Sequence, residues 1–502
     1  MKKTKLAIAI AAASLISAPA YATNGMNMAG YGPISTGMGG TAQAFNNGLG
    51  GMMNNPATMG MGAKEGNKFQ IGLGQLGPDV NSKMSAAMID QDSAGDSYFM
   101  PGFGYARKKD GITWGIGILG QGGMGTEYGK ADTTGMSGDL FARGYSMMTN
   151  PQTDPMNTVA LSGEENRSEL SVGRVLLPVN VEVNDKLTVG GSIDFVWAGM
   201  DIMMDVSGNQ FGALAEGGNV SGTMFSGLNQ MMANRVVSDV NWARFDFSDN
   251  SDYTGEAKGT GLGGKLGMTY KFNDKLSFGA SYHSKTNLSD MKGDATLSMN
   301  VNADTGVMMG GMPNGQYADM TIPVSGEIKL KDFQWPETFG MGFAFTPNEK
   351  WLVTADYKRI NWSDVMADFN MVFTADNVAT NGNFAGASID VTLPQDWEDQ
   401  NVFMLGTAYQ MNKQLTLRAG MNLSSNPIPD DKVNPLFPAI TEKHYMLGFG
   451  YNFDKQHSID GSITHAPEVT VTGSGALNNG VEISHAQTNW QLLYTYKWGI
   501  KK

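Results

Sequence analysis

The chain lacks cysteine altogether, and its 502 residues carry a formal net charge of −13. The absence of cysteine excludes a disulfide framework and thiol chemistry. The acidic balance, without a cluster of basic residues, argues against a nucleic acid partner. Beyond the first 22 residues the sequence also lacks an apolar run long enough for a transmembrane helix. Two classes remain: a soluble exported protein, or a membrane β-barrel, whose strands are only weakly hydrophobic one by one.

The first 22 residues have the pattern of a secretory signal peptide. Residues 2–5 supply the basic end, residues 6–16 the apolar stretch, and residues 20–22 (Ala-Tyr-Ala) the small-residue cleavage site. The apolar stretch is too short to span a bilayer, which disfavours a membrane anchor. We therefore expect an exported protein that is cleaved after Ala22.

Alternating apolar residues decide between the two classes. In LGGKLGMTYKFNDKLSFGASYH (262–283), apolar residues such as Leu266 and Tyr270 occupy every second position, and Lys265 and Thr269 lie between them. Period two places these two sets on opposite faces of a strand. The same pattern runs through FGYARKKDGITWGIGI (103–118), on both sides of a polar turn. The sequence therefore predicts antiparallel strands joined by tight turns.

Short turns and long connections alternate along the chain. Six short turns are predicted at 108–111, 184–186, 273–275, 346–350, 412–413 and 454–455. Seven longer connections lie near 76–96, 121–166, 203–256, 291–334, 373–397, 425–440 and 475–481. Together they join about fourteen strands, with all the long loops at one end. This asymmetry is typical of an all-β, antiparallel outer-membrane barrel, whereas a soluble sandwich should mix connection lengths.

Residues 23–62 contain no Asp, Glu, Lys, Arg or His, but they contain eleven glycines. A barrel of about fourteen strands is wide enough to approach the size that leaves a channel, and an open channel would leak small solutes. The segment enters the first strand from the periplasmic side, so it can fold back into the lumen, and its lack of charge avoids burying an unpaired ion. We expect residues 23–66 to form a plug inside a barrel formed by residues 67–502. A mobile, glycine-rich linker is the alternative.

Two groups of side chains are candidates for contact with an apolar ligand. In the loop at 203–256, spacing of i, i+4, i+7 and i+8 predicts one apolar face of a short helix, formed by Met224, Leu228, Met231 and Met232. That face could dock cargo outside the barrel or could pack on neighbouring loops. Alternation directs a second group towards the lumen, where one member could hold a carboxylate: Lys265, Lys271, His283, Lys285 and Arg418. Each of these could equally be an ordinary solvated residue, because barrel interiors are polar.

A series of motifs follows in a fixed order along nearly the whole chain. They are Asn55-Pro56-Ala57, GGMGTEY (122–128), WPETFGMGFAF (335–345), WLVTADYKRINWSD (351–364), LRAGMNLSSNPIPD (417–430) and GFGYNFDKQHSIDGSITH (448–465). In order and spacing the chain resembles the FadL-type family of outer-membrane transporters for long-chain fatty acids and aromatic hydrocarbons.

The resemblance implies a fourteen-stranded barrel closed by an N-terminal hatch that carries Asn55, Pro56 and Ala57. It also implies that cargo leaves sideways at a kink in the third strand. In this chain that strand begins at Ile112, and its outer half is rich in glycine: Gly120, Gly122, Gly123 and Gly125. Glycine weakens a strand and favours bulges, so we expect the kink there. The glycines could instead simply ease the curvature of the barrel.

Enzymatic chemistry has little support in the sequence. GIGILG (115–120) and GTGLGG (259–264) match the dinucleotide fingerprint, but both lie on predicted strands rather than before a helix. The five histidines lack the spacing of metal ligands. We therefore expect no catalytic residue, no metal and no other cofactor.

The sequence as a whole predicts a passive transporter in the outer membrane of a Gram-negative bacterium. Long-chain fatty acids are the first expected cargo and hydrocarbons the second. The expected partners are the hydrophobic cargo and the surrounding lipid and lipopolysaccharide, without nucleic acid. A general porin would instead need opposed charges and an inward-folded loop in the lumen, and an adhesin-like barrel would bind a partner through its loops while the lumen stays sealed.

Overall fold

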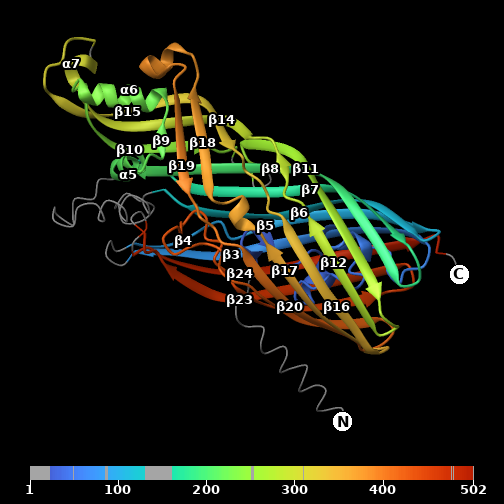
Figure 1. Cartoon of the computed structure of the whole chain (residues 1–502). Coiled ribbons are helices and arrows are strands. Elements are labelled where there is room, and N and C mark those ends of the chain that lie inside the picture. The colour runs from blue at the N-terminus through green and yellow to red at the C-terminus, as the bar shows by residue number, and fades with distance from the viewer. Residues whose placement is uncertain are drawn as a thin grey trace.

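The computed structural model describes residues 23–48, 50–84, 89–130, 161–249, 251, 254–308, 310–475, 478 and 480–500. The predicted signal peptide, residues 1–22, lies outside these described residues. Most of the described chain is β-strand (Figure 1). Within the described ranges, no helix combines the length and apolarity needed to cross a membrane.

The strands in chain order are β1 (Thr23–Asn24), β2 (Asn27–Met28), β3 (Gly66–Met84), β4 (Ile89–Asp92), β5 (Tyr98–Lys109), β6 (Ile112–Tyr128), β7 (Asn166–Glu182), β8 (Leu187–Ser207), β9 (Val220–Ser221), β10 (Val237–Phe247), β11 (Ala257–Lys271), β12 (Leu276–His283), β13 (Asn287–Leu288), β14 (Met291–Asp304), β15 (Tyr317–Lys331), β16 (Thr338–Asn348), β17 (Trp351–Ile360), β18 (Asp368–Ala375), β19 (Ser388–Pro394), β20 (Gln400–Gln410), β21 (Leu415–Leu423), β22 (Lys443–Asn452), β23 (His457–Thr472) and β24 (Glu482–Trp498). The helices are α2 (Pro33–Thr36), α3 (Gly50–Asn54), η1 (Pro56–Thr58), α5 (Gly208–Glu216), α6 (Thr223–Ala233), α7 (Thr305–Met308), η3 (Trp362–Asp364) and η4 (Ala379–Phe384).

The strands close into an antiparallel barrel. The circuit of hydrogen-bonded neighbours runs through β3, β5, β6, β7, β8, β11, β12, β16, β17, β20, β21, β22, β23 and β24. β24 then pairs back with β3, from Glu482 opposite Lys83 to Trp498 opposite Asn67. Because the ring is closed, its backbone N–H and C=O groups find partners without a free edge.

The two faces of the barrel wall differ in polarity as the alternation predicted. On β11, the outward-facing residues Leu262 and Leu266 are 57% and 65% exposed as whole residues, whereas the inward-facing residues Lys265 and Thr269 are each 2% exposed. Exposed apolar residues recur on the outside of most barrel strands, such as Ile193 and Leu405. An outward apolar belt with a polar interior is the arrangement that lipid demands of a barrel.

All six predicted short turns are present, at one end of the barrel that we call the turn end. Five of them share one device, in which the side-chain oxygen of an Asn or Asp accepts two backbone N–H groups two and three residues further on. The five acceptors are Asn184, Asn273, Asn348, Asn412 and Asp454. In the sixth turn, Asp110 and Gly111 both have positive φ, of 52° and 75°, which is the geometry of a tight hairpin.

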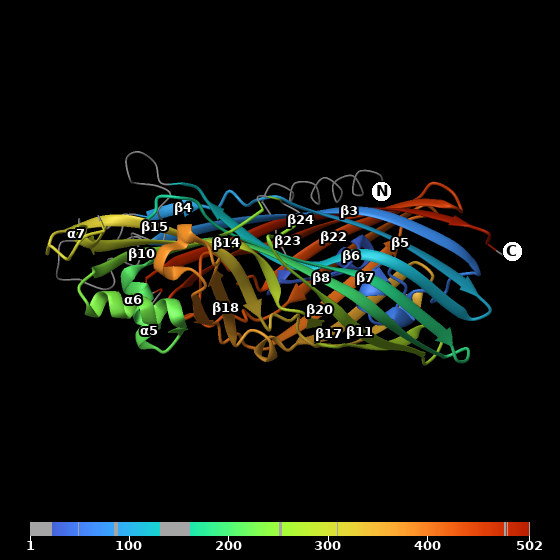
Figure 2. The same ribbon diagram turned by 90° about the horizontal axis from the view of Figure 1, so that it is seen from above.

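At the opposite end, the loop end, strands continue beyond the barrel. β10 pairs with both β8 and β14, and the ladder goes on through β15, β18 and β19 to β9. This extension projects past the barrel and carries α5, α6 and α7 (Figures 1 and 2). The described residues form one sheet of 24 strand segments, of which the fourteen named above make the closed circuit. Stretches such as 291–334, which were expected to be loops, form ladders of their own.

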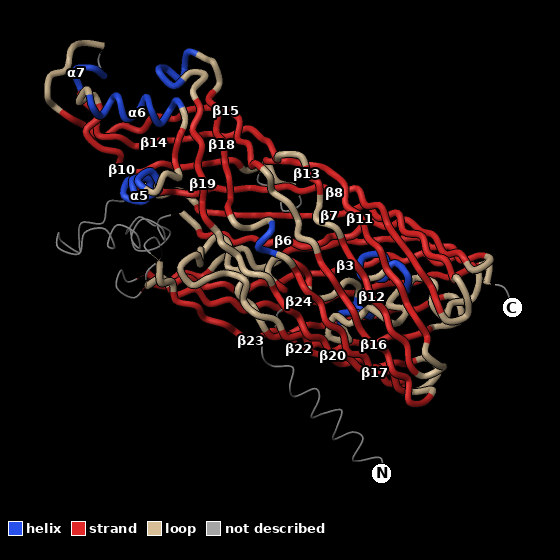
Figure 3. Tube along the Cα trace, viewed as in Figure 1, coloured by secondary structure: helices blue, strands red, loops and turns tan. Residues whose placement is uncertain are grey.

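The uncharged N-terminal segment, residues 23–62, lies within the ring of strands and is almost entirely buried up to Gly60 (Figure 3). Its hydrogen-bonding partners sit on strands around the whole ring: Lys108 on β5, Asn180 on β7, Met268 on β11, Ser277 on β12, Asp356 on β17 and Asn422 on β21. The segment is therefore held by the wall on several sides. Its role as a hatch stays a prediction.

Candidate functional site

The wall of the barrel is irregular at the third strand of the circuit, β6. The ladder between β5 and β6 ends at Phe103 opposite Ile118, although β6 continues to Tyr128. On its other side, the pairing of β6 with β7 shifts register between Gly120 and Gly122, which leaves Gln121 without a place in the ladder. Such a bulge bends a strand. The shift lies inside the glycine-rich stretch from which the sequence predicted a kink.

The N-terminal segment supplies partners for β6 at this bulge. Asn27 of β2 pairs with Gly122, and the N–H of Gly123 donates to the carbonyl of Met26 over 3.1 Å. The hydroxyl of Tyr31 donates to the carbonyl of Gln121 over 2.7 Å. A Cβ added at Gly122 would come within 2.1 Å of the Met26 carbonyl oxygen. The close approach of the two backbones therefore requires glycine at this position.

Two small hollows flank the bulge, and we call them the apolar hollows. One has a volume of about 60 Å³, and Met28, Tyr31, Met100, Leu119 and Gly120 contribute to its lining, which contains no charged residue. The other has a volume of about 100 Å³ and is lined by parts of β1, β3, β5, β6, β7 and β24. Its lining contains Glu169 and His485 but no lysine or arginine. The hollows suit a small apolar molecule better than an anion.

A buried ionic cluster lies further along the lumen wall. Arg174 on β7 contacts Asp194 on β8, with 2.9 Å between Nη1 and Oδ2, and the Nζ atom of Lys265 on β11 contacts the same carboxylate. The three side chains are at most 1% exposed. The Nε atom of Arg174 also donates to the Oε1 atom of Gln121 over 2.5 Å, which links the cluster to the bulge. Two cations thus share one carboxylate.

The other predicted carboxylate partners are placed differently. His283 faces the lumen, where its Nε2 atom lies 2.8 Å from the carbonyl oxygen of Asn54. Arg418 also faces the lumen and pairs with Asp460 over 2.9 Å, close to the turn end. Lys285 is exposed, and its role stays a prediction. The strand β12 ends at His283, so alternation no longer sets the direction of the side chains after it.

The three residues of the predicted hatch motif form one structural unit. Asn55 caps η1 by accepting the N–H of Ala57 over 3.0 Å, and its Nδ2 atom donates to the carbonyls of Gln43 and Met268 over 2.8 and 3.2 Å. The carbonyl of Pro56 accepts a hydrogen bond from Asn180 on β7. A Cβ at Gly267 or Gly190 would collide with this unit. The motif therefore fixes the segment to β7, β8 and β11.

The predicted helix in the loop at 203–256 is present as α6. Met224 and Leu228 are 1% and 3% exposed and belong to the core of the loop end, and Met231 is partly buried against it. Met232 is 38% exposed. Most of the apolar face thus packs on neighbouring elements rather than forming an open groove. Gly222 precedes the helix and provides no side-chain cap.

Sequence reasoning missed a cluster of three tryptophans in the lumen. Trp335 and Trp397 each pack edge-on against Trp362, at ring distances of 5.6 and 5.3 Å, and all three are at most 2% exposed. Trp362 lies against Gly25 and Trp335 against Gly122, so the cluster touches both the N-terminal segment and the bulge. The motifs WPETFG and NWSD contain two of the rings, but no local pattern shows that three distant residues meet.

Comparison with known proteins agrees with this architecture. Residues 9–490 match the model of the family described as outer membrane protein transport protein (OMPP1/FadL/TodX). The fold and this match define an outer-membrane β-barrel of a transport family for hydrophobic compounds, not of an enzyme family. The chain belongs to the OMPP1/FadL/TodX family, which confirms the resemblance and the outer-membrane location predicted from the sequence.

Similar proteins are known in sequence and in structure. The toluene transporter TodX of Pseudomonas putida is 32% identical, with a TM-score of 0.73 over 94% of this chain and 99% of that chain. The Ralstonia pickettii toluene transporter TbuX is 28% identical, with a TM-score of 0.70 over 94% and 99% of the two chains. The long-chain fatty acid transport protein of Escherichia coli is 24% identical over 94% of each chain.

Proposed function

We propose that this protein lets small, neutral hydrophobic molecules, with aromatic hydrocarbons as the first candidates, cross the outer membrane by passive flux. The observation that carries the proposal is the pair of apolar hollows at the β6 bulge, which lack a lysine or arginine to hold an acid. The solved relatives at 28% and 32% identity are toluene transporters, which supports the same cargo class. The sequence alone suggested the opposite order of expected cargo, with long-chain fatty acids first and hydrocarbons second.

Long-chain fatty acids are the second candidate cargo. The observation that favours them is the cluster of Arg174, Lys265 and Asp194, which holds one more cation than carboxylates. The relative in Escherichia coli is a long-chain fatty acid transport protein. Against this cargo, both cations of the cluster already contact Asp194.

We also propose that residues 23–66 act as a hatch and that cargo leaves sideways beside β6. The first part is supported by hydrogen bonds from the segment to strands around the ring, since these hold it across the bore. The second is supported by the early end of the β5–β6 ladder at Ile118, next to the apolar hollows. Planar-bilayer recordings of the intact protein should show no steady ionic conductance. A steady open channel would overturn the hatch.

Uptake measurements test the cargo. Cells that lack their own transporters of this family and express this chain should accumulate labelled toluene faster than control cells, with a smaller effect on oleate. Gly120→Phe places a ring in the smaller hollow, where an added Cβ meets only the flexible end of Met100, and should abolish the gain. The matched control is Gly227→Phe on α6, where the Cβ meets open space. Enhanced uptake of oleate alone would reject neutral hydrocarbons as cargo.

A further inference from the structure

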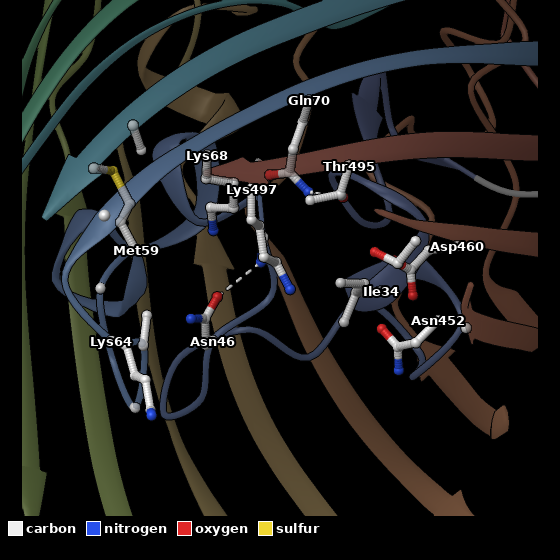
Figure 4. Close-up of a pocket in the computed structure, with 18 of the residues that line it drawn as sticks. Ile34, Asn46, Met59, Lys64, Lys68, Gln70, Asn452, Asp460, Thr495 and Lys497 are labelled. Atoms are coloured by element: carbon white, nitrogen blue, oxygen red, sulfur yellow. Dashed lines mark hydrogen bonds between the residues drawn. The ribbon is translucent and has the colours of Figure 1, made fainter. Parts of the chain in front are cut away.

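A large cavity lies at the turn end of the barrel, between the N-terminal segment and the wall (Figure 4). Its volume is about 480 Å³, several times that of either apolar hollow. The segment contributes Ile34, Asn46 and Met59, and the wall contributes residues of β3, β5, β6, β21, β22, β23 and β24. We call it the basal cavity.

The lining of the basal cavity is strongly cationic, although the whole protein is acidic. Its basic residues are Lys64, Lys68, Lys108, Arg418, Lys455 and Lys497, and its single carboxylate is Asp460. Two of the cations have acidic partners: Lys108 contacts Glu182 over 2.5 Å, and Arg418 contacts Asp460. The other four have no carboxylate within 4.0 Å among the residues that the structure describes. Such an excess of positive charge in a concave site attracts anions.

Two of the unpaired lysines directly oppose each other. Lys68 on β3 and Lys497 on β24 are cross-strand partners in the ladder that closes the barrel. Both side chains point into the cavity, next to Gln70 and Thr495 (Figure 4). Like charges at directly opposite positions destabilise a sheet. A position that opposes two ammonium groups is better explained by an anion between them than by the stability of the wall.

Arg418 adds a directional donor to the same cavity. Its side chain is 10% exposed, and one guanidinium nitrogen, Nη2, contacts Asp460. The other, Nη1, is buried and has no hydrogen-bond partner within the described residues. A buried guanidinium N–H normally has an acceptor, and the fork of arginine matches the oxygens of a phosphate or a carboxylate. The unused nitrogen leaves Arg418 with donor capacity that the described residues do not satisfy.

The cavity favours a phosphate group over the carboxylate of a fatty acid. A fatty acid needs an apolar channel for its chain, but polar and charged side chains and glycine backbone dominate this lining. A phosphate group offers more acceptor oxygens and carries up to two charges at neutral pH, which suits several cations that converge from β3, β21 and β24. The neutral amides of Asn46 and Asn452 lie in the same lining and can add hydrogen bonds.

We propose that the basal cavity binds a phosphate-bearing anion, held between Lys68, Lys497 and Arg418. The site is distinct from the apolar hollows, and the proposal goes beyond the transport of hydrophobic cargo. The bound group would neutralise the repulsion across the β3–β24 ladder. It would also connect this ladder to the N-terminal segment, which lines the opposite side of the cavity. Free phosphate and the headgroup of an anionic phospholipid share the required chemistry.

Thermal unfolding of the purified, full-length mature protein tests the site. In dodecyl maltoside without phosphate, added inorganic phosphate should raise the unfolding temperature more than chloride at equal ionic strength. In the variant Lys68→Gln/Lys497→Gln this shift should vanish, because each lost charge-assisted hydrogen bond weakens binding by about tenfold or more. Without phosphate, the same variant should unfold at the wild-type temperature or higher, since the like-charge repulsion is gone. A residue pair with a purely structural role would instead lower the unfolding temperature when it is replaced, even without phosphate.

The matched control is Lys186→Gln/Lys275→Gln, which removes two exposed turn lysines at the same end of the barrel that do not line the cavity. It should keep the full phosphate shift. A second arm compares bicelles of phosphatidylglycerol with bicelles of the phosphate-free digalactosyldiacylglycerol. Stabilisation by the former alone, dependent on Lys68 and Lys497, would identify a lipid headgroup as the source. No phosphate effect in either arm, an equal loss in the control, or stabilisation by oleate but not by phosphate would overturn the proposal.

Discussion

Two groups of cationic side chains in the same lumen differ in whether the chain provides them with a carboxylate partner. Around Asp194, two cations share a carboxylate, and none of the three side chains is more than 1% exposed. In the basal cavity, Lys68 and Lys497 oppose each other, and neither has a carboxylate within 4.0 Å among the described residues. Where the wall and the N-terminal segment close over a charge, the chain supplies its partner. In the basal cavity the part of the chain that the structure describes supplies partners for Lys108 and Arg418 but not for Lys68 and Lys497.

The difference shows that burial dictates pairing in this barrel. Desolvation of an unpaired ion costs several kcal/mol, on the order of 3–5. A buried charged side chain therefore needs an oppositely charged partner from the same chain. Water in a large cavity relieves that requirement and leaves charges free for an external ligand. Variants that remove partners at different depths test this explanation.

The largest expected effect belongs to Asp194→Ala. It leaves Arg174 and Lys265 buried together without an anion, so the free energy of unfolding should fall by about 3–5 kcal/mol. Urea titration in lipid vesicles measures this loss. Asp274→Ala, at an exposed turn position, is the control and should change the value little. In the double variant Asp194→Ala/Lys265→Met part of the loss should return, and its absence would contradict a charge-pairing role.

The next effect concerns a carboxylate that binds the N-terminal segment. The Oδ2 atom of Asp356 on β17 accepts the N–H groups of Ala42 and Gln43 over 2.6 and 3.0 Å. Asp356→Ala leaves two buried donors unsatisfied, which costs about 1–3 kcal/mol each. Proteolysis of the intact barrel should then cleave within residues 23–62 faster than in the wild type. Unchanged protection would mean that other contacts hold the segment.

A smaller effect is expected for Asn55→Ala in the hatch motif. The substitution removes the cap of η1 and the donor to Gln43 and Met268, and loss of a cap costs about 1 kcal/mol. Amide hydrogen exchange at residues 55–59 should accelerate while exchange in β11 stays slow. Asn46→Ala is a useful control, because among the described residues the side chain of Asn46 bonds only within the segment. Equal effects of both variants would contradict an anchoring role for Asn55.

The smallest effect depends on pH at an exposed turn. The N–H groups of Gln456 and His457 donate to Asp454 and lower the pKa of its carboxyl. The stabilisation is therefore complete above the unfolded pKa of about 3.9 and is lost as the pH falls through the lower folded value. Exchange of these two amides should rise in acid relative to the variant Asp454→Asn, whose amide does not titrate. The four turns that already use Asn serve as internal references.

The barrel itself could be predicted from the sequence because its pattern is local. Period two in 262–283 gave the inward and outward faces of β11 and β12 correctly, and polar turn residues gave all six short turns. The same rule does not set the direction of Lys285, two residues beyond the end of β12, because alternation holds only while the strand lasts. The alternation rule also did not distinguish irregular loops from the ladder of β14 and β15, because apolar and polar residues are interspersed in both kinds of segment.

The site could be predicted only in part because it depends on distant contacts. The glycines at 120–125 are visible as a run, but the partner of the bulge is Met26, about a hundred residues earlier. Lys265 was expected in the lumen, yet its partner Asp194 lies on another hairpin. The opposition of Lys497 to Lys68 exists only because β24 closes on β3, and no local pattern shows that pairing.

The side-chain clamps that recur at the turn end also have a practical consequence. Each holds its hairpin to a fixed loop length, because the acceptor must reach the amides two and three positions ahead. At the loop end, Asp304 clamps the N–H groups of Gly306 and Val307 in the same way and also accepts those of Asn314 and Gly315, which fixes the connection between α7 and β15. Foreign peptides for surface display should therefore be grafted at Gly382 in η4, where an added Cβ meets open space.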